Sequence, residues 1–263
     1  MFSRVYSASQ GLTPAMKDSR EQPDVSEWVR EKLGLTPDPV QRRLLDTSSN
    51  RVILNCTRQW GKSTITAAKA VHHAMTRPES LTLVVSPSGR QSGEFVRKAE
   101  QFARRLKLRV KGDGDNEMSV AFPNGSRLVG LPGNEQTVRG FSAVSLLLVD
   151  EAARVSEELY GAVRPMLAVT DGALWLLSTP FGKRGFFWET WQRGGEEWEK
   201  VRVPATECPR IGSKFLEEER RQMGDRHFRQ EYLCEFVDSV CAVFDSDLVR
   251  RAISSDVKPL KIP

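Results

Sequence analysis

The sequence predicts an α/β protein whose sheet is mainly parallel and is covered by helices on both faces. Three observations support this prediction. Short apolar runs rich in β-branched residues recur along the chain, amphipathic segments separate them, and a tight loop at 56–64 joins the first run to a helix. Strands that alternate with helices form parallel sheets, because each strand must return through a crossover connection.

The elements are predicted in order from these local patterns. Residues 1–24 are polar and lack periodicity, which indicates an N-terminal arm. Strands are expected at 51–55, 81–85, 144–149, 173–178 and, as an edge strand, 199–203. Helices are expected at 25–33, 39–45, 62–76, 90–106, 156–168 and 213–233, and short strands with turns within 108–130. We expect a core domain at 25–205 and a C-terminal lid and linker segment at 206–263.

Composition limits the class of protein. The chain has 263 residues, of which 39% are hydrophobic and 28% charged, as in ordinary globular domains. It contains no apolar run of membrane-spanning length and no signal peptide, so a cytoplasmic location without membrane contact is expected. The four cysteines, at 56, 208, 234 and 241, have no metal-like spacing and fit a reducing compartment.

Positive charge gathers in one segment, although the net charge is only +5. Between Arg97 and Lys111 only Glu100 opposes the basic residues, which are Arg97, Lys98, Arg104, Arg105, Lys107, Arg109 and Lys111. Such a cluster can hold a nucleic-acid backbone without reading bases, or it can be a solvated helix face. The sequence leaves both interpretations open.

The loop after the first strand has the layout of a phosphate-binding loop. Its residues are Thr57, Arg58, Gln59, Trp60, Gly61, Lys62, Ser63 and Thr64. In such a loop, backbone amides and the helix N-terminus surround the phosphates, the lysine reaches the β- and γ-phosphates, and the hydroxyl after it binds Mg²⁺. Lys62 and Ser63 are the candidates for these roles. Cys56 stands where the pattern G-x-x-x-x-G-K-[ST] has its first glycine.

A second motif lies at 146–151, where an apolar strand ends in two carboxylates. A buried parallel strand delivers its last residues to the edge of the sheet at which α/β proteins bind ligands. Asp150 is expected to hold Mg²⁺ through water, and Glu151 to orient and polarise the attacking water. The two motifs together predict an enzyme that binds ATP and Mg²⁺ and hydrolyses ATP.

With these motifs in place, the chain resembles the ATPase domain of the large terminase subunit, the DNA-packaging motor of tailed bacteriophages. The resemblance covers about 25–250 and rests on several segments. These are the variant loop 57–64 with Arg58 inside it, residues 125–132 and 137–141 before the acidic strand, the coupling motif 177–180, and the lid segment 228–236. The family often lacks the first glycine of the loop, so Cys56 counts less against ATP binding.

The resemblance implies a P-loop NTPase fold of the RecA/ASCE-like type, a small C-terminal lid and further site residues. Gln41 is expected to recognise adenine, and Ser178 and Thr179 to sense the γ-phosphate. Arg58 and Arg139 both become candidates for stabilising transition-state charge. Arg58 would act in its own subunit and Arg139 would project into the next subunit.

The implied function is ATP hydrolysis that drives double-stranded DNA into a phage procapsid in the host cytoplasm. The implied partners are DNA, the portal of the procapsid, the small terminase subunit and further copies of the chain in a ring, with a monomer in isolation as an alternative. No nuclease activity is expected, because few residues follow Phe244. Two alternatives are a helicase-like translocase, which would need a second RecA-like domain, and a non-catalytic DNA-binding assembly module with a degenerate loop.

Overall fold

A single mainly parallel sheet organises the chain. The computed structural model describes residues 24–238 apart from 117, 132, 134–137 and 139, together with residue 252. Within this part of the chain, seven strands lie in the order β3-β4-β2-β5-β6-β1-β7. Their bounds are β1 Arg51–Cys56, β2 Leu81–Val85, β3 Ser119–Ala121, β4 Arg127–Leu131, β5 Val144–Asp150, β6 Ala173–Ser178 and β7 Glu199–Val203. Only β3 runs antiparallel to its neighbour, so the predicted sheet type is confirmed.

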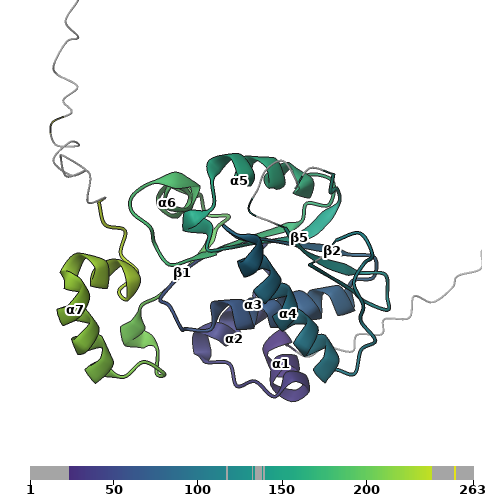
Figure 1. The fold of residues 1–263 in the computed structure, drawn as a ribbon, viewed down its shortest axis with the longest axis horizontal. Helices are drawn as coiled ribbons and strands as arrows, with labels where there is room; N and C mark the ends of the chain where they lie inside the picture. The colour runs from purple at the N-terminus through teal and green to yellow at the C-terminus, as the bar shows by residue number, and fades with distance from the viewer. Residues whose placement is uncertain are drawn as a thin grey trace, which may run out of the picture.

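Helices cover both faces of the sheet, as the sequence predicted (Figure 1). One face carries α1 Val25–Leu33, α2 Pro39–Asp46, α3 Lys62–Thr76 and α4 Gly89–Arg105. The opposite face carries α5 Glu157–Val163, the 3₁₀ helix η3 Arg164–Leu167 and α6 Gly185–Arg193. All five residues of β2 are buried, because a central strand covered on both faces has no solvent side.

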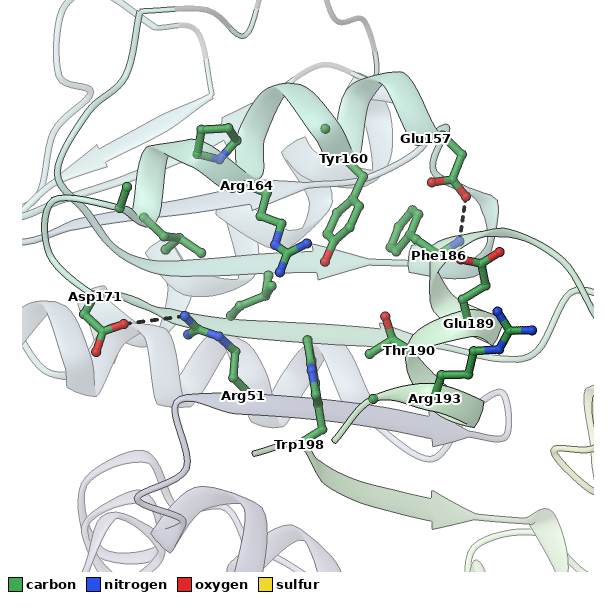
Figure 2. A pocket seen from close by; sticks show the side chains of 16 residues that line it. Arg51, Glu157, Tyr160, Arg164, Asp171, Phe186, Glu189, Thr190, Arg193 and Trp198 are labelled. Carbon is green, nitrogen blue, oxygen red and sulfur yellow. Dashed lines mark hydrogen bonds and ion pairs between the residues drawn. The ribbon is translucent and has the colours of Figure 1, made fainter. Parts of the chain in front are cut away.

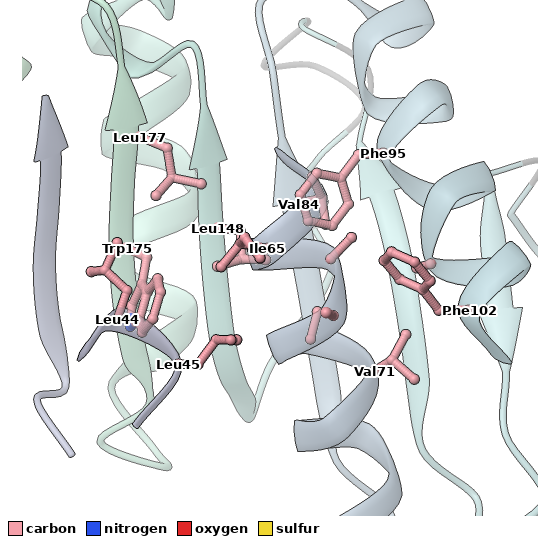
Figure 3. Packing of buried hydrophobic residues seen from close by; sticks show 14 of the residues in the cluster. Leu44, Leu45, Ile65, Val71, Val84, Phe95, Phe102, Leu148, Trp175 and Leu177 are labelled. Atoms are coloured by element: carbon pink, nitrogen blue, oxygen red, sulfur yellow. The ribbon is translucent and has the colours of Figure 1, made fainter. Parts of the chain in front are cut away.

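The apolar core therefore has two layers. On the α3 side, Trp175 and Leu148 from the strands belong to one cluster with Ile65 from α3, and Figure 3 shows Leu148 next to Ile65. A second cluster on the other side contains Leu147 and Phe187. Neighbouring side chains on one strand enter different layers, because successive strand residues point to opposite faces of the sheet.

The C-terminal segment forms a smaller unit beside β7 and the end of β1. It begins with the 3₁₀ helix η4 Ala205–Glu207 and continues into α7 Ser213–Glu231. Its own apolar cluster consists of Ala205, Leu216, Phe228 and Tyr232. Gly224 adopts φ 77° inside α7 and bends it, a conformation that glycine reaches without a Cβ clash. The boundary that we drew at residue 205 remains a prediction.

One expected helix differs from the structure. The predicted helix at 156–168 ends at Val163, and a 3₁₀ turn follows it. Pro165 explains the change, because proline lacks the amide hydrogen that an α-helix needs and its ring clashes with the preceding turn. The short strands expected within 108–130 are confirmed and form at Ser119–Ala121 and Arg127–Leu131. Residues 1–23 of the predicted arm lie outside the described residues.

The strand order brings the motifs together. Strand β6 lies between β1 and β5 and pairs in parallel with each of them. In this register Asn55 lies opposite Ser178, and Leu177 lies opposite Asp150. The ends of β1, β5 and β6 therefore meet at the carboxyl edge of the sheet, where ligands of α/β proteins bind.

Candidate nucleotide-binding site

The loop between β1 and α3 has the backbone of a phosphate cradle. Gly61 adopts φ +95°, a conformation that favours glycine, and a Cβ there would lie 3.4 Å from Gln41 Nε2. Gln59 also has a positive φ, of 63°. Helix α3 begins at Lys62 and runs for 15 residues. Its first-turn amides have no intrahelical acceptor and carry the positive end of the helix dipole, so the loop can bind anions.

Cys56 does not disturb this geometry. It is the last residue of β1 and is fully buried, so its position needs no left-handed backbone. Burial raises the pKa of its thiol to about 12, which keeps the thiol protonated at neutral pH. Its carbonyl accepts a hydrogen bond from Thr179 Oγ1 at 3.1 Å. The glycine requirement of the loop is therefore met at Gly61.

The two motifs meet through paired contacts. Lys62 Nζ lies 2.6 Å from Glu151 Oε1, with side chains that are 11% and 22% exposed. Ser63 Oγ donates to Asp150 Oδ2 at 3.0 Å. Burial lowers the pKa of Lys62, but Asp150 and Glu151 outweigh it and the pKa is raised overall. Burial also raises the pKa of Asp150, against the opposing effect of Lys62.

The side-chain oxygen atoms of Ser63 and Asp150 suit a magnesium ion. A serine hydroxyl and a carboxylate are hard donors, and Mg²⁺ takes one or two carboxylates and completes its shell with water and substrate phosphates. Among the described residues, no group of three or more His, Cys, Asp and Glu side chains could hold a metal by itself. Ser63 and Asp150 therefore fit a metal that arrives with a phosphate ligand.

Beyond these motifs, a chain of alternating charges continues from Glu151 to α7, which lies in the predicted lid segment. Glu151 has a left-handed backbone with φ 53°. Arg154 in the 3₁₀ helix η2 Ala152–Arg154 contacts Glu151 Oε2 at 3.5 Å and Glu231 Oε1 of α7 at 3.3 Å. Glu231 Oε2 accepts from Arg58 Nε at 2.5 Å. The loop, the end of β5 and the lid are thus joined by ion pairs.

Sequence patterns did not reveal Arg154 or Glu231 as site residues. The position of Arg154, three residues after Glu151, and the place of Glu231 inside the segment 228–236 were the available signals.

Arg58 was expected in the site, and its side chain is 60% exposed. Arg58, Lys62, Glu151 and Arg154 line one cavity of about 270 Å³ with Gln59 and Gln91. Arg139 lies outside the described residues, so its role remains a prediction.

Gln41 lies against the loop. Its Nε2 donates to the Trp60 carbonyl at 3.0 Å, and its Oε1 accepts from the amide of Asp38, the N-cap of α2, at 3.0 Å. A side-chain amide has two N–H donors and two acceptor lone pairs. One N–H donor and one acceptor lone pair of Gln41 therefore remain, and these are the groups needed to pair with an adenine edge. Gln41, Gly61 and Thr64 help to line a cavity of about 300 Å³.

Residues 177–180, which the resemblance identifies as a coupling motif, contact neighbouring segments. Ser178 and Thr179 are buried, and Ser178 Oγ accepts from the amide of Ala153 in η2 at 3.1 Å. Farther on, the amide of Gly182 donates to Gln230 Oε1 of α7 at 3.0 Å. This segment therefore joins the residues after Glu151 to the lid, and γ-phosphate sensing by Ser178 and Thr179 remains a prediction.

A larger cavity lies elsewhere. It measures about 830 Å³ and lies between α5 and α6, against the amino ends of β1 and β6 (Figure 2). Arg51, Arg164 and Arg193 line it together with acidic residues and the stacked rings of Tyr160 and Phe186. Because the phosphate loop is at the carboxyl ends of the strands, size alone does not identify the nucleotide site.

Several basic side chains of segment 97–111, at the end of α4 and beyond it, already have partners within the protein. Arg97 pairs with Glu94 at 2.9 Å, and Arg104 pairs with Glu100 at 2.7 Å. Arg105 donates to the Leu33 carbonyl at 3.3 Å. The segment still exposes basic side chains, so both interpretations of it stay open. No helix in the described part of the chain is long and apolar enough to cross a membrane.

The fold and site define the class of protein. A phosphate loop, an additional strand between β1 and β5, and a glutamate directly after the aspartate of β5 are the features of a P-loop NTPase of the ASCE type. The family model for the terminase large subunit, T4-like-virus type, N-terminal region, matches residues 53–251. The chain belongs to this family.

Known relatives agree with this assignment. The large terminase subunit of Thermus virus P23-45 is 26% identical over 249 residues, which cover 81% of this chain and 51% of that protein. The large terminase ATPase domain of Thermus phage P74-26 has a solved structure with 25% identity and a TM-score of 0.70, covering 82% of this chain and all of that domain. The chain spans about half the length of the curated relatives it matches.

More distant structures share the fold. The large terminase of another thermophilic bacteriophage, solved in complex with ADP, has a TM-score of 0.63 at 14% identity, covering 81% of this chain and 52% of that one. The large terminase of bacteriophage HK97 has a TM-score of 0.68 at 14% identity, covering 81% of this chain and 55% of that one.

Proposed function

We propose that this chain hydrolyses ATP as the ATPase domain of a DNA-packaging motor. The observation that carries the proposal is the contact of Lys62 with Glu151 beside that of Ser63 with Asp150. These contacts bring a phosphate-binding cation, a water-orienting carboxylate and a pair of metal-binding oxygens to one corner of the sheet. Similarity to the P74-26 ATPase domain and to the large terminase solved with ADP supports a nucleotide as the ligand.

Each side chain has a defined task in this proposal. Lys62 donates its N–H groups to the β- and γ-phosphates, and the α3 amides hold the same oxygens. Glu151 accepts a hydrogen bond from the attacking water and aims it at the γ-phosphorus. Arg58 adds positive charge within the loop. Ser63 and Asp150 would hold Mg²⁺, which neutralises phosphate charge when bound.

The wider role follows from family membership. We infer that hydrolysis drives double-stranded DNA into a procapsid in the host cytoplasm, with a portal, a small terminase subunit and further copies of the chain as partners. Contacts to DNA phosphates would be independent of base sequence and sensitive to salt. A non-catalytic assembly module is the main alternative. The burial of Cys56 within β1 removes the one sequence feature that favoured it.

Two substitutions test the chemistry. Lys62→Ala should abolish hydrolysis and weaken ATP binding, because a point charge on the phosphates is lost. Glu151→Gln should stop turnover but keep ATP binding, because only the water-orienting carboxylate is lost. Hydrolysis is measured by phosphate release and ATP binding by calorimetry. Wild-type binding without hydrolysis, both alone and with DNA, would support the non-catalytic alternative.

A further inference from the structure

Arg210 lies next to the phosphate loop, although it comes from the loop that leads into α7. Its guanidinium donates to the Trp60 carbonyl, which also accepts from Gln41 Nε2. It also lies 3.7 Å from Asp38 Oδ2, while the other carboxylate oxygen of Asp38 accepts from the Gln41 amide. Gln41 and Arg210 are thus held by the same two groups, one in the loop and one at the start of α2.

The same arginine separates two cavities. One, of about 300 Å³, contains Gln41, Gly61 and Thr64. The other, of about 410 Å³, contains Phe215 and Tyr232 from α7 and its end. Arg210 lines both cavities, and its side chain is 50% exposed. Of these two cavities, only the first combines the phosphate-loop residue Gly61 with Gln41, so a nucleotide with its phosphates on the loop would have its base there.

We propose that Arg210 is the base-stacking residue of this nucleotide site and forms the outer wall of the cavity that takes the adenine. A guanidinium is a planar cation that stacks on π-systems, and its edge remains free to hydrogen-bond. The contacts to Trp60 and Asp38 hold the edge of Arg210, which leaves its face for the base. Gln41 then reads the edge of adenine, and Arg210 supplies affinity through the ring face. This inference rests on the proposed nucleotide function.

The test compares ligands with and without a base. Binding of ADP and of inorganic pyrophosphate is measured by calorimetry in the presence of Mg²⁺, for wild type, Arg210→Ala, Arg210→Lys and Phe215→Ala. Arg210→Ala should weaken ADP binding about tenfold, which lies between the values for an exposed and a desolvated cation–π contact, and leave pyrophosphate binding unchanged. Arg210→Lys keeps the charge near Asp38 but lacks the planar face, so it should lose most of the same affinity. Phe215→Ala is the matched control in the neighbouring cavity and should bind ADP as wild type does.

Several results would overturn the inference. Equal losses for ADP and pyrophosphate would make Arg210 a phosphate ligand, and full recovery in Arg210→Lys would make its charge sufficient. A loss in Phe215→Ala without a loss in Arg210→Ala would put the base in the other cavity. Each of these leaves the proposed function intact, whereas a wild-type protein that binds neither ADP nor ATP would contradict the proposed function itself. Thermal melting confirms that each variant is folded.

Discussion

Arg154→Ala is the substitution that tests the organisation of the site most directly. Arg154 contacts Glu151 at 3.5 Å and Glu231 at 3.3 Å, and its guanidinium carbon lies 4.6 Å from the centre of the Phe181 ring. If Glu151 orients the attacking water, Arg154 acts as a positioning residue for that carboxylate. Its removal should therefore lower the rate of the chemical step and leave nucleotide binding unchanged.

The expected size follows from these contacts. The three charged side chains are 16–24% exposed, so solvent screens them only in part. Hydrogen bonds to charged groups contribute about 1.5–3 kcal/mol, and contacts of this length belong at the lower end. A loss of about 1.5 kcal/mol at Glu151 predicts a decrease in kcat of about tenfold. The contact to Glu231 and the ring contact together predict a loss of about 2 kcal/mol in unfolding free energy.

Arg184→Ala provides a matched control. The Arg184 guanidinium also lies over the Phe181 ring, with its carbon 5.0 Å from the ring centre, and within the described residues no ion pair joins it to either glutamate. The Arg184→Ala substitution should therefore leave kcat unchanged. Steady-state ATPase assays give kcat and KM, and urea titrations give the unfolding free energy. An increase in KM with kcat preserved in Arg154→Ala would show that this arginine binds the nucleotide directly and would refute the positioning role.

Three further predictions concern DNA, assembly and pH. Neutralising Arg104, Arg105 and Lys107 together should flatten the salt dependence of DNA binding in a filter-binding titration, and an unchanged slope would assign the cluster to solvent. Mixing Arg139→Ala with Glu151→Ala subunits should restore some hydrolysis under assembling conditions if Arg139 acts in trans, and no recovery would make Arg139 structural. Burial lowers the pKa of His73 from 6.5 to about 4. The unfolded chain therefore binds this proton more readily, and the free energy of unfolding should fall by about 3 kcal/mol as the pH drops from above 6.5 to 4. Urea titrations should show a smaller loss in His73→Gln, and equal losses would contradict the assignment.

The strands and the first site residues could be predicted because their signals are local. Each buried parallel strand is a short apolar run, and the loop residues 57–64 follow one of these runs directly. The carboxylates of Asp150 and Glu151 follow another. Parallel strands align their carboxyl ends, so two local patterns were sufficient to place Lys62 near Glu151.

The remaining site residues depend on distant contacts. Arg58 and Glu231 are separated by 173 positions, and Arg210 and Trp60 by 150. No period or spacing in a single sequence records such a pair. The end of the helix at Val163 has a local signal in Pro165, so this boundary is recorded in the sequence.

Glu231 links the two halves of the site physically. One carboxylate oxygen accepts from Arg58 in the phosphate loop, and the other pairs with Arg154 beside Glu151. The glutamate is 16% exposed, so removing either arginine leaves a largely buried charge with a single cationic partner, which is costly. In the preceding residue, Gln230, the Oε1 atom accepts a hydrogen bond from the amide of Gly182, which follows residues 177–180. A shift of α7 would therefore act on the loop, on the carboxylate of Glu151 and on residues 177–182 at once, which is the coupling that the proposed motor function requires.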